Sequence, residues 1–343
     1  MTVQNNLSTD AQRALDTAVL QHLFDPNVAM IDVGYRIRDR RGHRLHVDET
    51  CVRVHVHQKL RGEAFAAFAA QYPERVVDAK RLDFPVDVPE ATYSVQPWWP
   101  WYWQPPLNPR TRAFNPLVGG ISVSNGLLTG SGTLGGLVQD RVTGDAMILS
   151  NWHVLVGGWH VFPDTPIYQP GTGDAGGPAH TVAHLSRDSM SQHLDAAVAL
   201  VDGTRPLINE QYKIGPVCGA CNPMLGQTVY KSGRTTGVTY GIVSGIDGYL
   251  TMYYGGVRRV IRHTIHISQM PTGGQVSAPG DSGSWWLDVV TNCAIGLHFA
   301  GSNDPEFGVA MAMPQVLDAL DVEIVPELLP ERNVAGSLER YEV

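Results

Sequence analysis

Three short stretches of the chain carry the residue types that nucleophilic catalysis requires. His153 follows an apolar run in ILSNWHVL, Asp195 begins one in HLDAAVALV, and Ser282 lies in the turn-like stretch SAPGDSGSWW. A serine hydroxyl is inert at neutral pH without a neighbouring base. An imidazole that is oriented by a buried carboxylate can supply that base. The three stretches therefore predict a Ser-His-Asp triad, in the chain order His, Asp, Ser.

The glycines beside Ser282 have a role of their own in this chemistry. Acyl transfer needs backbone N–H groups aimed at the oxyanion that develops on the substrate. Gly280 and Gly283 allow a tight turn, which would direct the amides of Gly280 and Ser282 into one oxyanion hole. Trp285 and Trp286 follow the turn, and we expect them to be core residues of the next strand.

Residues 117–322 resemble the trypsin-like serine proteases of the double β-barrel fold. The resemblance rests on the stretches above and on LVGGISVSN, YQPG and KSGRTTGVTYGIV. It is closest to a cytosolic, disulfide-free branch of bacterial and plant type. It implies that His153 is the general base, Asp195 the orienting acid and Ser282 the nucleophile. It also implies an oxyanion hole formed by the amides of Gly280 and Ser282.

The chain departs from this family around the nucleophile. Ser284 stands where the family usually has a second glycine. In secreted trypsins the counterpart of Asp281 pairs with a freshly cut N-terminus, but no tryptic cleavage point is evident before Leu117. We therefore expect no activation of that kind, and Lys231 or Arg234 are candidate partners of Asp281.

The resemblance also locates a pocket for P1, the substrate residue before the scissile bond. Ser277, His298 and Gly301 would line this pocket. Val276 falls near the position of the acidic floor of trypsin, so cleavage after Lys or Arg is not supported. Glutamyl endopeptidases and viral 3C-type proteases place a histidine at the position of His298. Two interpretations stay open: His298 and Ser277 read a P1 Glu or Gln, or His298 is a strand histidine satisfied within an apolar wall.

Residues outside the triad predict the domain organisation. Residues 1–93 predict a small α/β domain, with a helix over 8–24, strands in VAMIDVGYRI and CVRVHVHQKL, and a short Ala/Phe helix in EAFAAFAAQY. Residues 94–116, rich in Pro and Trp, predict an extended strap that packs along the domain seam or forms an aromatic docking site for a partner or a Pro-rich peptide. Residues 117–322 would form the protease domain and 323–343 a C-terminal tail.

The fold class follows from the pattern of apolar runs and turns from residue 117 onward. Short apolar runs between glycine-rich turns indicate an all-β barrel or sandwich from residue 117 onward. With the family resemblance, we expect a mainly β protein. Its chymotrypsin-like double β-barrel would be preceded by the small α/β domain.

Composition and charge exclude several classes of function. The 343 residues are 43% hydrophobic and carry a formal net charge of −8, which gives no reason to expect nucleic acid or a membrane surface as partner. The first residues resemble no signal peptide, and the four cysteines are too few for a secreted disulfide framework, so we expect a cytoplasmic protein. Cys218 and Cys221 lack a second ligand pair and are expected to be free thiols. His55 and His57 fit the polar face of a half-buried strand better than a metal pair.

Together these features predict a serine endopeptidase that cleaves protein or peptide substrates through an acyl-enzyme, without cofactor or metal. The alternative is a protease-fold binding or scaffold protein, whose site is occluded or latent beneath the N-terminal domain and the strap. An esterase is a third interpretation, but no lipid-like acyl pocket is evident. Whether the chain forms a homo-oligomer is left open.

Overall fold

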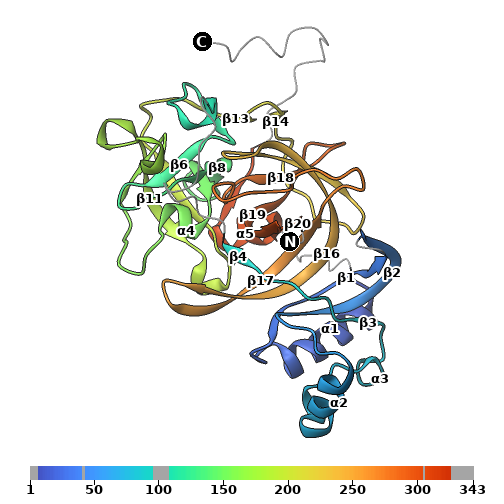
Figure 1. The fold of residues 1–343 in the computed structure, drawn as a ribbon. Coiled ribbons are helices and arrows are strands. Elements are labelled where there is room, and N and C mark those ends of the chain that lie inside the picture. Colours follow the sequence, from blue (N-terminus) through green and yellow to red (C-terminus); the bar gives the residue numbers. More distant parts are fainter. Residues whose placement is uncertain (1–6, 41–42, 96–107, 304–305, 326–343) are drawn as a thin grey trace.

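The computed structural model describes residues 7–40, 43–95, 108–303 and 306–325 of the chain. Two large sheets dominate it (Figure 1). The first sheet has the order β21-β8-β9-β12-β11-β10-β6-β7. Its strands are β6 (Ser122–Asn125), β7 (Gly132–Thr133), β8 (Gly136–Asp140), β9 (Ala146–Ser150), β10 (Pro166–Tyr168), β11 (Thr181–Asp188), β12 (Ala197–Val201) and β21 (Val322–Glu323).

The second sheet has the order β15-β18-β19-β20-β17-β16-β1-β2-β3, and β4 pairs with β19 beside this path. Its strands are β1 (Val28–Arg40), β2 (His43–Val56), β3 (Val86–Asp87), β4 (Ser94–Val95), β15 (Thr228–Gly233), β16 (Gly237–Tyr254), β17 (Val257–Ser268), β18 (Trp285–Asp288), β19 (Ala294–Asn303) and β20 (Glu306–Ala312). A small third sheet joins β5 (Leu117–Gly119), β13 (Leu207–Gln211) and β14 (Gly215–Pro216). The mainly β, chymotrypsin-like double-barrel fold expected from the sequence is confirmed, with the α/β segment before it.

The largest hydrophobic core spans both sheets. Trp285 is fully buried within it, and Trp286 is fully buried in a neighbouring cluster of the second sheet, which confirms both as core residues. Gly135 and Gly136 are required where Trp285 approaches the first sheet: a Cβ on either glycine would lie 2.3 and 2.7 Å, respectively, from the indole. The indole therefore fixes how closely the two sheets pack behind the Ser282 turn.

Few helices accompany the sheets. Helix α1 (Thr9–His22) confirms the helix expected over 8–24, and the Ser8 hydroxyl caps it by accepting a bond from the Ala11 amide. The remaining helices are α2 (Gly62–Gln71), α3 (Ala79–Leu82), α4 (Trp152–Leu155) and α5 (Met313–Leu320). In the described part of the chain, none of the helices has the length and apolarity to cross a membrane.

The N-terminal segment shares a sheet with the second barrel. Strand β1 pairs with β2 on one side and with β16 on the other, with Met30 opposite Leu250 and Ile31 opposite Tyr249. In Figure 1 this segment lies at one side of the barrels, where β16 meets β1. The domain boundary at residue 93 stays a prediction. The Trp-rich part of the expected strap, 96–107, and most of the expected tail, 326–343, lie outside the described residues.

The N-terminal strands differ from the expectation at two points. They are longer than the two apolar runs, since β1 continues to Arg40 and β2 begins at His43, because ladder hydrogen bonds do not require apolar side chains. The expected polar strand face is buried at Arg53 and His55, which are 0% and 1% exposed, whereas His57 is exposed as expected. Asp32 accepts hydrogen bonds from both buried side chains, and this pairing makes their burial tolerable.

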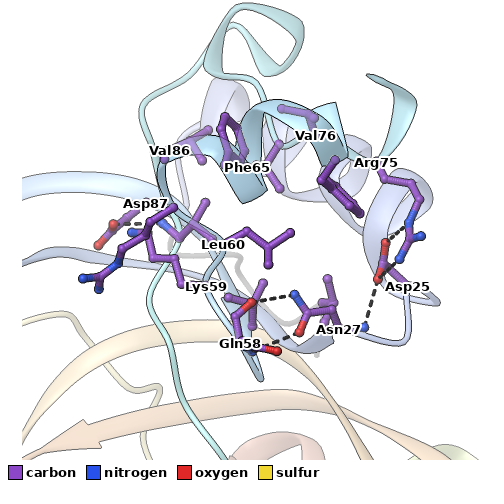
Figure 2. A pocket seen from close by; sticks show the side chains of 17 residues that line it. Asp25, Asn27, Gln58, Lys59, Leu60, Phe65, Arg75, Val76, Val86 and Asp87 are labelled. Atoms are coloured by element: carbon purple, nitrogen blue, oxygen red, sulfur yellow. Dashed lines mark hydrogen bonds and ion pairs between the residues drawn. The ribbon is translucent and has the colours of Figure 1, made fainter. Parts of the chain in front are cut away.

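A cavity of about 570 Å³ lies in this N-terminal segment, between the sheet and α2. Figure 2 shows Leu60, Phe65 and Val86 on its apolar side, and the ion pair of Asp25 with Arg75 at one end. All its lining residues belong to the range 25–88. It is therefore separate from the residues expected to do chemistry.

Candidate active site

His153 is held by the short helix that follows an apolar strand. Strand β9 ends at Ser150, and α4 begins two residues later with Trp152. The side chain of Asn151 at this junction donates a hydrogen bond from Nδ2 to the main-chain oxygen of Asp195 at 2.8 Å. This bond ties the start of α4 to the segment that precedes β12. His153 and Asp195 are thereby brought together although they are far apart in the sequence.

Asp195 binds His153 through both of its carboxylate oxygens. Oδ1 accepts from the main-chain N–H of His153 at 3.0 Å, and Oδ2 accepts from the imidazole Nδ1 at 2.6 Å. Asp195 is fully buried and the His153 side chain is 8% exposed. A carboxylate can only accept, so the proton of the neutral imidazole lies on Nδ1. The lone pair of Nε2 is then available, and within the described residues this buried atom has no hydrogen-bond partner.

Tyr254 is a third member of this group, and it was not predicted from the sequence. Its hydroxyl donates to Asp195 Oδ2 at 2.9 Å. Burial, and then the charge of Asp195, raise the pKa of Tyr254 well above its usual value, so it stays a neutral donor. The ring packs edge-on against Trp152, and the Tyr254 carbonyl accepts from Trp159 Nε1 at 3.1 Å. The tip of the β16–β17 hairpin is thus fixed beside the His–Asp pair.

Ser282 occupies a tight turn that packs against α4. Gly280 and Gly283 have φ angles of +99° and +98°, which favour glycine at both positions. The Ser282 carbonyl accepts from the Thr133 amide at 2.7 Å. A Cβ on Gly132 would lie 2.5 Å from Val154 and 2.9 Å from the Ser282 carbonyl oxygen. The bare glycine therefore lets the Ser282 turn and the helix of His153 approach each other.

The two amides expected to form the oxyanion hole belong to peptide units whose carbonyl oxygens accept hydrogen bonds. Because the N–H and the carbonyl of a peptide unit point in opposite directions, these bonds also set the direction of each N–H. The Thr235 hydroxyl donates to the Pro279 carbonyl at 2.8 Å, so the Gly280 N–H points the other way. The Asp281 carbonyl accepts from the amide and the hydroxyl of Ser284, which orients the Ser282 N–H in the same manner. Ser284, in the place of the usual glycine, therefore contributes a hydrogen bond to the turn.

Asp281 pairs with Lys231, one of the two candidates. Lys231 Nζ lies 2.9 Å from Asp281 Oδ2, and both side chains are fully buried. Amides of Thr235 and Thr236 donate to Oδ1 at 2.9 and 3.1 Å. Arg234, the other candidate, instead forms an ion pair with Asp174. A side-chain ammonium therefore fills the role of partner to this carboxylate, and it is present in the uncut chain.

The expected P1 pocket residues Ser277, His298 and Gly301 are all buried. His298 Nδ1 accepts from the indole Nε1 of Trp286 at 3.3 Å. Burial and the charge of Lys231 lower the pKa of His298 to about 3. Ser277 is fully buried, and within the described residues its hydroxyl has no hydrogen-bond partner. Gly301 lies opposite Gly308 in the β19–β20 ladder.

Glu306 is a further residue of this region that the sequence did not single out. Its Oε1 accepts from the amides of Val276 and Ser277 at 2.5 and 3.2 Å. The carboxylate thus braces the segment before the nucleophile turn, near the position where an acidic floor was considered and not expected. Glu306 could have been predicted only if it had been known that β20 begins beside this segment.

A cavity of about 300 Å³ adjoins His153. Its wall combines the loop 127–132, α4 and the hairpin tip at Tyr253, Tyr254 and Gly255. Elsewhere, no group of three or more His, Cys, Asp or Glu side chains that could hold a metal ion occurs among the described residues. All four cysteines are free thiols, with Cys218 and Cys221 partly exposed.

No family model and no curated protein matches the chain. Several solved structures of serine proteases are similar to it. A glutamic-acid-specific serine protease shares 20% identity over 61% of this chain and 100% of its own, with a TM-score of 0.45. Thermobifida fusca protease A shares 16% over 61% and 98%, with a TM-score of 0.45. Cellulomonas bogoriensis chymotrypsin shares 19% over 61% and 98%, with a TM-score of 0.44.

The pair of Asp281 with Lys231 predicts a specific pH dependence of stability. Burial alone would raise the pKa of Asp281, but the charge of Lys231 and hydrogen bonds from Lys231 and Thr236 lower it to about 2. Because the folded pKa lies below the unfolded value of about 3.9, the stabilisation is complete above pH 4 and is lost as the pH falls towards 2.

Urea unfolding of wild type and Asp281→Asn at several pH values measures this effect. At pH 7 we expect the variant to be less stable by about 3–5 kcal/mol, because the buried ammonium of Lys231 loses its counter-charge. The difference between the two free energies of unfolding should shrink from pH 4 to pH 2. A difference that stays constant over this range would contradict the pairing.

Proposed function

We propose that the chain is a serine endopeptidase in which Ser282 is the nucleophile, His153 the general base and Asp195 the orienting acid. The observation that carries the proposal is the His153–Asp195 contact. Its 2.6 Å bond places the imidazole proton on Nδ1 and leaves the Nε2 lone pair free to accept another. Gly132 lies close to both the Ser282 turn and α4, since a Cβ on it would meet the Ser282 carbonyl oxygen and Val154.

The proposed reaction follows from these groups. The Ser282 hydroxyl oxygen attacks the peptide carbonyl carbon while His153 Nε2 takes its proton, and the charge moves to the substrate oxygen. The amides of Gly280 and Ser282 stabilise this oxyanion. His153 then gives the proton to the leaving amine as the C–N bond breaks, which leaves an acyl ester on Ser282. Water, deprotonated by His153, hydrolyses the ester and restores the hydroxyl.

Tyr254 is proposed as a positioning residue for this reaction. Its hydroxyl donates to Asp195 Oδ2, the oxygen that also accepts from the imidazole Nδ1–H, so it restricts rotation of the carboxylate. The imidazolium that forms during attack is stabilised only while this oxygen faces it. A neutral phenol can do this across the working pH range, because its raised pKa keeps it protonated.

For P1, the tautomer of His298 supports glutamine over glutamate. The indole of Trp286 can only donate, so His298 Nδ1 accepts and the ring proton lies on Nε2. With its pKa lowered to about 3, the imidazole is neutral and carries no charge to offset a buried carboxylate. In the proposed complex the side-chain carbonyl of a P1 glutamine is the acceptor for this Nε2–H. Ser277 supplies a hydroxyl for the amide of the same side chain.

The second candidate, a latent or occluded site, is favoured by one specific observation. Strand β4 lies antiparallel on β19 at Ala300 and Gly301, and Ser282 is fully buried. This observation concerns access to the site, not its chemistry. It is consistent with an endopeptidase that is held inactive as well as with a scaffold.

Cleavage mapping in a bacterial proteome tests the proposed function. We expect new peptide termini with the wild type that are absent with Ser282→Ala, because only the former can form the acyl-enzyme. Equal sets of termini from the two proteins would refute an endopeptidase that is active as it stands and would favour the second candidate.

A pair of matched substrates tests the P1 proposal. Peptides that differ only in P1 Gln or Glu should be cleaved with kcat/KM higher for Gln by roughly 10- to 100-fold, the order expected when one buried polar group is left unsatisfied. The preference should disappear in His298→Ala. A preference for Leu or Phe that this variant leaves unchanged would exclude the role of His298.

The role of Tyr254 is measured with two neighbouring phenylalanine substitutions. Tyr254→Phe keeps the ring and removes the hydroxyl, so kcat should fall about 10- to 100-fold, as for loss of one hydrogen bond to a charged group, while KM is retained. Tyr253→Phe is the control, since Tyr253 is 67% exposed on the same hairpin. Similar kcat values for the two variants would remove Tyr254 from the mechanism.

A further inference from the structure

Strand β18 leaves one edge of β19 uncovered beside the nucleophile. Strand β18 pairs with β19 only as far as Trp285 opposite Leu297, because the preceding residues form the Ser282 turn. The turn itself bonds to the next β19 residue: the Gly283 amide donates to the His298 carbonyl at 2.9 Å. Ser282 Oγ then lies 3.4 Å from the Phe299 carbonyl oxygen. The free edge of β19 therefore begins at the nucleophile and continues to Gly301.

Strand β4 of the same chain occupies this edge. Its two residues pair antiparallel with β19, with Val95 opposite Ala300 and Ser94 opposite Gly301. An open strand edge is a site where an extended peptide adds by main-chain hydrogen bonds. Because the edge starts at Ser282, a polypeptide substrate that adds here would lie across the nucleophile. The chain's own β4 and such a substrate cannot occupy the edge together.

We propose that β4 is an intramolecular competitor that holds the site latent, and that the competing ligand is an extended peptide segment bound antiparallel to β19. The proposal rests on the endopeptidase function proposed above. It assigns to the N-terminal segment a role in regulating access. The closed arrangement agrees with the burial of Ser282, which is 0% exposed, and of His153, which is 8% exposed at its side chain.

Tyr93, the residue before β4, fastens this strand to the N-terminal segment. Its hydroxyl lies 2.6 Å from His55 Nδ1, and its ring packs 5.0 Å from that of Phe307 on β20. His55 Nε2 faces Asp32 Oδ1 at 3.2 Å, so its proton lies on Nε2 and Nδ1 accepts from Tyr93.

The same Asp32 is held by the buried guanidinium of Arg53. The chain of contacts from Arg53 through Asp32 and His55 to Tyr93 is buried at its centre, so it has a defined geometry. A buried polar network on β1 and β2 thus sets where β4 begins. The network thus gives a structural role to polar side chains that were expected to face solvent.

The competition has a kinetic signature. A two-residue strand makes few hydrogen bonds, but its attachment to the chain gives it an effective concentration of about the millimolar order. The apparent dissociation constant for substrate is the intrinsic constant divided by the fraction of molecules whose edge is free. Release of β4 should therefore lower KM and leave kcat unchanged, because the groups at Ser282, His153 and Asp195 are not altered.

Three single variants of the full chain test this proposal. Val95→Pro removes a strand N–H and disrupts the pairing, and Tyr93→Phe removes only the hydroxyl that reaches His55. Thr92→Ala is the control, because it removes an exposed hydroxyl just before Tyr93 and leaves the pairing of β4 with β19 unchanged. The substrate is the tetrapeptide Tyr-Ser-Val-Gln, the sequence of residues 93–96, acylated on an aminocoumarin. Hydrogen exchange of the segment 299–301 is measured in parallel and needs no turnover.

We expect Val95→Pro and Tyr93→Phe to lower KM roughly tenfold or more, in line with release of a tethered ligand, and to speed exchange at 299–301. Thr92→Ala should match the wild type in both. If the wild type cleaves the peptide but all three variants share its KM and exchange, β4 is no competitor and the endopeptidase stands. If none cleaves it, but exchange rises in the two variants alone, β4 covers the edge and the endopeptidase fails.

Discussion

The carboxylate of Asp195 is the point at which the separate parts of the molecule meet. One oxygen accepts the main-chain N–H of His153, and the other accepts both the imidazole and the Tyr254 hydroxyl. A fully buried carboxylate is costly unless its hydrogen bonds are made. The donors come from α4 and from the β16–β17 hairpin, so the burial of this one carboxylate requires both elements to be in place beside the segment before β12.

The hairpin also joins this site to the N-terminal segment. Strand β16 ends at Tyr254 beside Asp195, and earlier along its length it pairs with β1. The N-terminal segment thus reaches the site by two routes: through β16 to Tyr254, and through Tyr93 to β4. Since Asp281 already has Lys231 as partner, assembly of the turn needs no cut chain end. In this account control is exerted on access to the β19 edge and not on the formation of the oxyanion hole.

Local signals explain what could be predicted from sequence. Ser282 lies between glycines whose positive φ angles are confirmed, and the apolar runs before His153 and after Asp195 correspond to β9 and β12. The contacts that were missed join residues far apart in the chain. Tyr254 and Glu306 are identified as partners only once β16 and β20 are placed, and the choice between Lys231 and Arg234 depended on where Asp174 lies. Burial of Arg53 and His55 depended in the same way on Asp32.

The most direct test of the central claim is covalent labelling of Ser282 by a fluorophosphonate, followed by intact mass and peptide mapping. A serine activated by His153 should form one phosphonyl adduct on Ser282 in the wild type, formed more slowly in His153→Ala and absent in Ser282→Ala. The absence of any adduct in the wild type and in Val95→Pro, where β4 is released, would contradict an activated nucleophile and leave a protease-fold scaffold.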